Sequence, residues 1–225
     1  MNLKQVAFLF IGQTPRPDTM EEMYRYLPDF QIWEYGALDG VSEAEIVSEY
    51  APKSDQDLLI SRLRNGQSVQ ISEAMLGSRL QLKLEQAVME GAQLCVLMCT
   101  GSFPGLKCRV PLLTMDEVFH RNMELPPNTK AIGLIVPMEE QKAQFAAQYA
   151  HFKKDVLTAA ASPYGLTETI VKEALKLKAM GAECICLDCM GYTDIQAQEV
   201  ALNTQLPVHT PRRETANQIL KRTLK

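Results

Sequence analysis

Histidine is scarce in this 225-residue chain, and the signatures of several enzyme classes are missing. The three histidines, His120, His151 and His209, do not have the spacing of metal ligands. No glycine-rich phosphate loop of the Walker or dinucleotide type occurs, and no G-x-S-x-G nucleophile motif occurs. The sequence therefore disfavours zinc, nucleotide and serine-hydrolase chemistry, and we expect no metal and no cofactor.

Long apolar runs and a strong excess of positive charge are also lacking. The longest apolar run near the N-terminus, Val6–Ile11, is too short for a signal sequence or a membrane span. The net charge of −4 argues against general binding to nucleic acid or to an anionic membrane. We therefore expect a cytoplasmic protein with neither nucleic acid nor membrane as a partner. Its six cysteines would be reduced there rather than joined in disulfides.

What is present is an ordinary globular composition with alternating strand and helix patterns. Hydrophobic residues make up 46% and charged residues 22% of the chain. Helical patterns separate the apolar runs, and the sequence Asn65-Gly66 joins two short strands as a hairpin. Strands separated by helices predict parallel βαβ units with right-handed crossovers. The fold class predicted is therefore α/β.

Two stretches of the chain, 90 residues apart, align without a gap. Gly91-Ala92-Gln93 leads into an apolar run and then Cys99-Thr100-Gly101, and Gly181-Ala182-Glu183 leads into an apolar run and then Cys189-Met190-Gly191. The repeat predicts two related α/β half-domains, whose cysteines could face one another across a cleft. We expect residues 1–127 plus 205–225 in the first half and 128–204 in the second.

Each repeat places one cysteine at the carboxyl end of a predicted parallel strand, over 94–99 and 184–189. Ligands of open α/β sheets bind at that edge. Backbone N–H groups in the following turn can receive a carboxylate and favour a thiolate. Cys99 and Cys189 are therefore the candidate catalytic residues. The alternative is that both are small buried hydrophobic residues, as free cysteines often are.

The remaining cysteines are assigned no chemistry. Cys95, Cys184 and Cys186 lie inside the predicted strands and are interpreted as core residues, and Cys108 lies in a stretch without a readable pattern. A metal site built on Cys184, Cys186 and Cys189 is disfavoured, because residues 184 and 186 share one face of a strand while 189 points to the other.

The loop after the first strand carries polar residues that could bind a substrate. Arg16 could hold a carboxylate through two parallel hydrogen bonds, although a solvated turn explains the same residues equally well. Tyr192 could cover the cleft or bind a ligand, whereas Asp188 should point to the strand face opposite Cys189 and is not chosen as a base. The candidate substrate-binding residues are Gly12, Gln13, Thr14, Arg16, Thr100, Gly101, Ser102, Met190, Gly191 and Tyr192.

Several short sequence motifs of this chain resemble those of a known group of proteins. The strand-end motifs of the two similar halves, LMCTG and LDCMGY, resemble the aspartate/glutamate/hydantoin racemase superfamily. Four segments taken together resemble the AroM family over nearly the whole chain, and these are IGQTPRPD, ALDGVSEAEIVSEYAP, IVPMEEQ and LDCMGY. The resemblance implies two pseudo-symmetric α/β sandwiches with a small-carboxylate site between them. It also implies that Cys99 and Cys189 act as acid and base without a cofactor.

Two functions of different classes remain open at this stage. The first is a cofactor-independent racemase, isomerase or lyase acting on a small carboxylate such as an amino acid or dicarboxylic acid. Within it, related proteins use one thiol for isomerisation or decarboxylation, and Cys189 is then the more secure thiol. The second is a binding protein that senses a small carboxylate without catalysis. The sequence leaves the substrate open, and a homodimer is one option for its assembly.

Overall fold

The computed structural model describes residues 5–54 and 57–223, and the chain divides into two compact units. One unit contains the residues up to Met115 and those from Ala216 onward, and the other contains Asp116–Thr215. Residues 116–127 and 205–215 were expected in the first half, but they belong to the second unit. There, Val208 pairs with Ile185 in the second sheet, and Phe119 packs in that unit's core.

The first unit is built on a four-stranded parallel sheet in the order β2–β1–β5–β6. The strands are β1 (Gln5–Phe10), β2 (Gln31–Gly36), β5 (Leu94–Leu97) and β6 (Leu112–Leu113). β1 is a continuous apolar run that is buried from Val6 to Phe10, as expected of a central strand covered on both faces.

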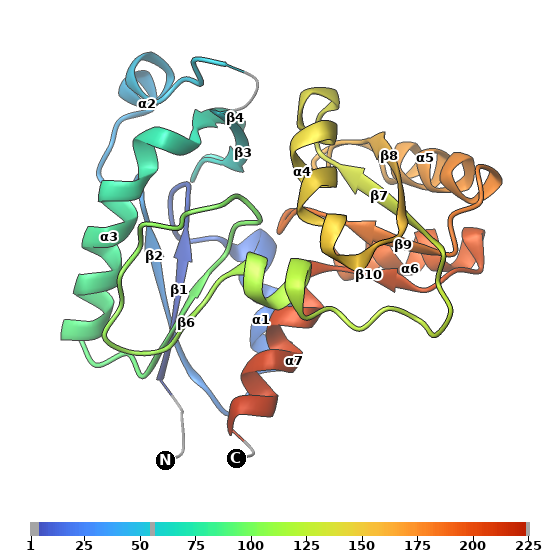
Figure 1. Ribbon diagram of the computed structural model, residues 1–225. Coiled ribbons are helices and arrows are strands. Elements are labelled where there is room, and N and C mark those ends of the chain that lie inside the picture. The colour runs from blue at the N-terminus through green and yellow to red at the C-terminus, as the bar shows by residue number, and fades with distance from the viewer. Residues whose placement is uncertain (1–4, 55–56, 224–225) are drawn as a thin grey trace. The chain divides into compact units, whose positions relative to one another are not determined.

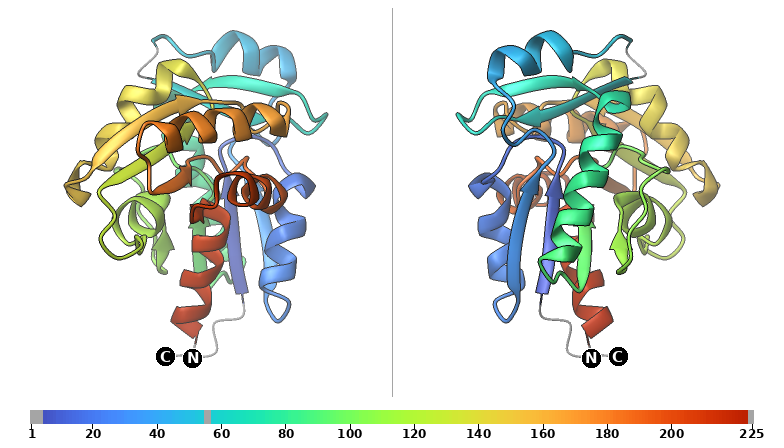
Figure 2. Two further views of the ribbon diagram at one scale, coloured as in Figure 1. Left: turned by 90° about the vertical axis from the view of Figure 1, so that its right-hand side faces the viewer. Right: turned by 90° about the vertical axis from the view of Figure 1, so that its left-hand side faces the viewer.

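Helices cover both faces of this first sheet. Figures 1 and 2 show α3 (Glu73–Met89) along one face and α1 (Pro17–Tyr26) along the other. Leu76, Leu80 and Leu84 recur every four residues on α3 and pack in one cluster with Leu9 and Leu97 of the sheet. This packing holds β1 and β5 side by side, so their carboxyl ends meet at one edge.

The second unit repeats the same architecture. Its sheet has the order β8–β7–β9–β10 and is also parallel. The strands are β7 (Ala131–Val136), β8 (Asp155–Ala160), β9 (Cys184–Leu187) and β10 (Val208–His209). β7 takes the place of β1 and β9 that of β5, so the predicted α/β class with two parallel-sheet halves is confirmed.

The helices of the second unit also cover both faces of its sheet. One face packs against α5 (Thr167–Ala179) and α6 (Asp194–Thr204), and the other against α4 (Lys142–Gln148) and a π-helix, η2 (Asp116–Arg121). The sequence pattern over 139–152 predicts one helix, but the structure has three shorter pieces there, because the 3-10 turns η3 (Glu139–Gln141) and η4 (Ala150–Phe152) flank α4.

Matching backbone contacts support the internal repeat. Gly91 and Gly181 end α3 and α5 with φ of 106° and 107°, the positive φ that favours glycine after a helix. Met98 N–H then donates to Leu9 at the end of β5, and Asp188 N–H donates to Ile135 at the end of β9. The two repeats are therefore alike in backbone hydrogen bonding as well as in sequence.

The remaining elements are a short helix, a hairpin and the last helix of the chain. The first unit inserts α2 (Glu43–Glu49) and the antiparallel hairpin β3 (Leu58–Arg62) and β4 (Ser68–Ser72) between β2 and α3. The hairpin confirms the prediction from Asn65-Gly66. Ser42 caps α2 by accepting from Glu45 N–H. The last helix, α7 (Pro211–Thr223), runs from the second unit into the first.

Candidate functional site

Cys99 lies in the turn after β5, two residues beyond the end of the strand. The strand was expected to reach Cys99, but its ladder ends at Leu97. Cys99 is buried, and its Sγ accepts the backbone N–H of Gly101 at 3.3 Å. The sulfur is therefore held against the backbone of its own turn.

Cys189 occupies the matching place in the second unit. β9 ends at Leu187 rather than at Cys189, so this thiol also lies in a turn. Its Sγ accepts the N–H of Gly191, again at 3.3 Å, and its side chain is partly exposed. The two turns therefore present their sulfurs in the same local geometry.

This geometry favours a charged sulfur and leaves donors for a ligand. An N–H group directed at sulfur stabilises the thiolate over the thiol. In the described part of the chain, the N–H groups of Thr100 and Met190 have no hydrogen-bond partner. Each turn therefore offers one thiol and one neighbouring backbone donor to an anion.

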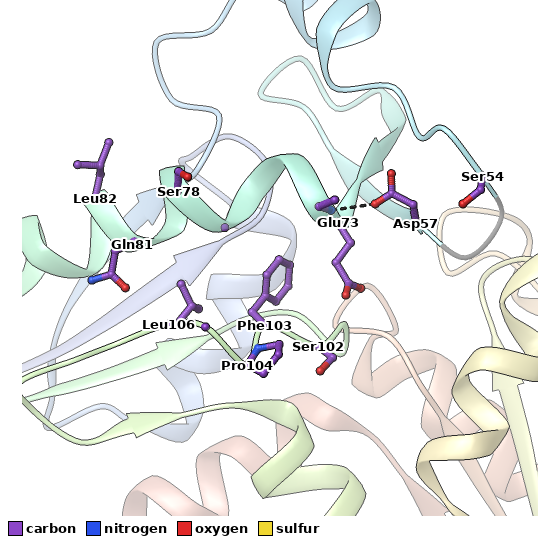
Figure 3. Close-up of a pocket in the computed structure, with 13 residues that line it drawn as sticks. Ser54, Asp57, Glu73, Ser78, Gln81, Leu82, Ser102, Phe103, Pro104 and Leu106 are labelled. Atoms are coloured by element: carbon purple, nitrogen blue, oxygen red, sulfur yellow. Dashed lines mark hydrogen bonds between the residues drawn. The ribbon is translucent and has the colours of Figure 1, made fainter.

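A carboxylate lies against the Cys99 turn. Glu73, in the first turn of α3, points toward the loop that carries Ser102 (Figure 3). A Cβ placed on Gly101 would lie 3.0 Å from Glu73 Oε2, so the carboxylate reaches the backbone of the turn. Burial raises the pKa of Glu73, a backbone hydrogen bond from Ser102 lowers it, and the charge of Asp57 raises it further.

A pocket of about 840 Å³ opens beside this carboxylate. It lies between the first half of α3 and the loop from Ser102 to Leu106 (Figure 3). Asp57 and Glu73 line it together with Ser102, which is one of the predicted binding residues, and Phe103 adds an apolar wall. The first unit therefore has a cavity at the loop that follows Cys99.

A guanidinium lies against the Cys189 turn. Arg212, at the start of α7, is 1% exposed, which is rare for an arginine. Its Nε donates to the Met190 carbonyl at 2.6 Å and its Nη2 to the Gly191 carbonyl at 3.1 Å. Arg212 therefore places a buried positive charge within one residue of Cys189.

A buried polar cluster lies on the other side of the same strand end. Asp188 Oδ2 is 3.0 Å from His120 Nε2 and accepts the Tyr149 hydroxyl at 3.0 Å. Burial, followed by the charge of Asp188, raises the pKa of Tyr149 well above its usual value. Asp188 thus points into the α4 side of the sheet, whereas Cys189 packs with the α5 and α6 side. The predicted orientation of Asp188, away from Cys189, is confirmed.

The loop after β1 holds its predicted site residues with internal hydrogen bonds. Gln13 donates to the Val41 carbonyl, and Thr14 donates through both its N–H and its hydroxyl to Asp39. A Cβ at Gly12 would lie 2.5 Å from Ser61 Oγ, so no larger residue fits at this position. These contacts fix the loop at the carboxyl end of β1, and its role in binding stays a prediction.

Arg16 and Tyr192 also have partners inside their own units. Arg16 makes two parallel hydrogen bonds of 2.8 Å to Asp18 and lies over the Phe10 ring. The Tyr192 hydroxyl donates to the Ala161 carbonyl at 2.6 Å. Burial, followed by the charge of Cys189, raises the pKa of Tyr192 well above its usual value. A ligand would have to share or displace these partners.

Three of the other four cysteines lie in the cores, as predicted. Cys95, Cys184 and Cys186 are fully buried inside β5 and β9. Burial is the main cause that raises the pKa of Cys95 and of Cys186, while a hydrogen bond with Cys186 lowers that of Cys184.

In the described residues, no three His, Cys, Asp or Glu side chains gather as metal ligands would. No helix among them is long and apolar enough to cross a membrane.

Sequence reasoning missed Glu73, Arg212 and His120. The sequence indicates that Glu73 lies in the first turn of a helix, where an acid is a common stabilising feature. That position does not predict the contact of its carboxylate with Gly101. Pro211 marks a helix start and so places Arg212 in a first turn, yet nothing local indicates that its side chain is buried.

Comparisons with known proteins agree with this architecture. The structure resembles glutamate racemase RacE1 from Bacillus anthracis, with a TM-score of 0.66 at 13% identity, covering 98% of this chain and 82% of that one. It also resembles an unliganded arylmalonate decarboxylase, with a TM-score of 0.60 at 14% identity over 98% and 93% of the two chains. A third is the maleate isomerase Iso from Pseudomonas putida S16, with a TM-score of 0.56 at 9% identity over 96% and 92%.

At these identities the likeness shows the fold, which is the two-domain α/β fold of the racemases. None of the curated proteins matches the chain. The model of one family, described as AroM protein, matches residues 6–221, almost the full length. The chain therefore belongs to the AroM family.

Proposed function

We propose that this protein is a cofactor-independent enzyme of the racemase or isomerase type, acting on a small carboxylate through cysteine acid/base chemistry. Cys99 and Cys189 are its acid and base. The observation that carries the proposal is the geometry that the two turns share. In each repeat a strand-end thiol accepts an N–H at 3.3 Å from the glycine two residues later.

The range of reactions is suggested by the proteins that share the fold. By name these are racemases, a decarboxylase and a maleate isomerase. Each of these names refers to a small carboxylic acid, namely glutamate, aspartate, an arylmalonate or maleate. Substrates of this class, an amino acid or a dicarboxylic acid, suit turns that offer backbone N–H donors.

In the proposed chemistry, one thiol site accepts a proton from the substrate and the other donates a proton to it in each turnover. A thiolate takes the α-proton from the substrate carbon, and the electron pair left behind spreads into the adjacent carboxylate. The N–H groups of Thr100 and Met190 stabilise the charge that develops there. The second thiol then gives its proton to the opposite face of the carbon, which inverts the centre.

Exchange of the α-proton in heavy water tests this proposal. A panel of amino acids and dicarboxylic acids is incubated with wild-type protein, and deuterium incorporation is followed by proton NMR. We expect exchange on at least one member of the panel and its loss in Cys189→Ser, because serine is similar in size but a much weaker base. Cys99→Ser should lose racemisation as well.

Two other outcomes separate the alternatives. Loss of activity in Cys189→Ser alone would indicate a one-thiol isomerase or decarboxylase instead. If calorimetry shows a carboxylate binding while neither exchange nor decarboxylation occurs, the protein is a binding protein and the catalytic proposal is wrong. Retained activity in both serine variants would show that both cysteines are structural.

A further inference from the structure

The two thiol turns share their backbone geometry but not their charged neighbours. Glu73 brings a carboxylate against the Cys99 turn, since Oε2 lies 3.0 Å from where a Gly101 Cβ would be. Arg212 brings a guanidinium against the Cys189 turn, bonded to the carbonyls of Met190 and Gly191. We infer that Cys189 is the thiolate and Cys99 the thiol of the resting protein. This inference deepens the proposed function and depends on it for its catalytic meaning.

The charges near the Cys99 turn favour the protonated sulfur. Glu73 is next to Gly101, the residue whose N–H reaches Cys99 Sγ. Asp57 lies close enough to Glu73 to affect its ionisation, and both acids line the pocket beside the turn. A negative charge disfavours a thiolate, because like charges repel more strongly when partly buried.

The charges near the Cys189 turn favour the thiolate. Arg212 is buried, so its field is weakly screened by solvent. Asp188 is an acid that opposes it, but its Oδ2 is shared by His120 and Tyr149 on the other side of the strand. Tyr192 and Tyr164 also approach this turn, the latter close to Gly191. Arg212 is therefore the strongest influence on Cys189 among these groups.

The assignment gives the reaction a direction. Cys189 takes the α-proton first, the electron pair passes into the substrate carboxylate, and the Cys99 thiol supplies a proton to the opposite face. The product leaves Cys189 protonated and Cys99 ionised. Transfer of one proton from Cys189 to solvent and one from solvent to Cys99 restores the resting state, so protons and charge balance. The free protein should first process the enantiomer whose α-proton faces Cys189.

Thiol titration in two variants, each lacking one of the two turn cysteines, tests the inference without a substrate. Cys99→Ser leaves Cys189 to be measured, and Cys189→Ser leaves Cys99. The rate of alkylation by iodoacetamide is measured against pH, with each site identified by peptide mass spectrometry. The midpoint of the pH profile reports ionisation, whereas accessibility changes only its height. We expect the Cys189 midpoint to lie below that of Cys99 by about one pH unit or more.

Glu73→Gln makes the test specific. In the Cys189→Ser background it should lower the Cys99 midpoint by about one pH unit, because it removes the nearby charge. In the Cys99→Ser background it should move the Cys189 midpoint by less than that, because Glu73 contacts the Cys99 turn. Glu85→Gln is the matched control on the same helix, since this exposed acid lies about 18 Å further along α3, and it should move neither midpoint.

Arg212→Gln should raise the Cys189 midpoint, and where that variant does not fold, the Glu73→Gln result decides. A lower midpoint for Cys99 than for Cys189, or no effect of Glu73→Gln on Cys99, would overturn the inference. The proposed function fails separately, through absence of exchange in heavy water. Midpoints ordered as expected with no exchange would leave the thiol assignment standing without a racemase role.

Discussion

Asp57 is a single residue that connects the hairpin region to the start of α3. Its carboxylate accepts the Ala74 N–H at 2.8 Å and the Ser72 hydroxyl. Burial by itself would raise the pKa of Asp57, but the hydrogen bonds from Ala74, Ser72 and Lys53 outweigh it and lower that pKa below 3.8. An anion at this position also interacts favourably with the helix N-terminus.

We therefore predict that Asp57→Asn lowers the free energy of unfolding at pH 7. The loss should be about 0.5 kcal/mol, because solvent screens this partly exposed group. A folded-state pKa below the unfolded one means that this stability is present above pH 3.8 and is lost as pH falls through the folded value. Urea unfolding at pH 7 and pH 3 measures both effects.

The matched control is Asp155→Asn, an exposed acid at the start of β8. It should change stability little at either pH. An Asp57→Asn deficit that persists at pH 3 would contradict the electrostatic explanation and indicate a packing effect.

At this scale, the sequence reveals the thiols but not their charged neighbours. Cys99 and Cys189 could be located because the repeat aligns them at matching strand ends. The contact of Arg212 with Met190 joins residues 22 positions apart, and the two partners come from different elements. No local pattern carries such a contact, since only the folded packing of α7 brings it about.

At the scale of elements, each repeat depends on one glycine that ends a helix. Gly181 has a φ of 107° and open space around its Cα, so a methyl group there would meet no atom within 4 Å. Any cost of adding that methyl group therefore comes from the backbone conformation and not from a clash.

We predict that Gly181→Ala lowers the free energy of unfolding by about 1–2 kcal/mol. Gly77 is the matched control, because it also has open space but lies inside α3. Gly77→Ala should raise stability by about 0.5–1 kcal/mol, since alanine is a better helix former. Thermal unfolding of both variants checks this, and equal effects of the same sign would show that the positive φ of Gly181 is not the cause of the loss.

The start of α6 provides another element-scale prediction. Thr193 and Gln196 form a capping box, in which each side chain bonds to the other's backbone. Thr193→Ala should cost about 1 kcal/mol of unfolding free energy. Gln198→Ala, at an exposed position of the same helix, should cost far less. Chemical denaturation of the two variants gives the comparison, and equal losses would mean that the cap contributes nothing.

The elements with a strong local pattern are those that the sequence predicts. Apolar runs predicted the central strands β5 and β9, and Asn65-Gly66 predicted the hairpin. The stretch that holds Cys108 and the residues after it has no readable sequence pattern, because β6 is two residues long and η2 is a π-helix. Neither has the length or the period that makes an element visible in a sequence.

At the scale of the whole molecule, the duplication explains why the fold could be predicted so far. Both sheets have the same strand order, and each places a cysteine turn after its third strand. The family resemblance identified from short phrases is confirmed by the match over residues 6–221. That the two thiols act on one substrate stays a proposal, because a duplicated sheet places each thiol within its own unit only.

The isotope pattern from a single enantiomer most directly tests that the two thiols act as an acid and base pair. One enantiomer of an active carboxylate is converted in heavy water, and the two enantiomers are separated and analysed for deuterium early in the reaction. A two-thiol mechanism predicts deuterium in the product enantiomer and protium in the unreacted substrate, because one thiol removes the proton and the other returns a deuteron. Equal deuterium in both enantiomers, or turnover that survives Cys189→Ser, would contradict it.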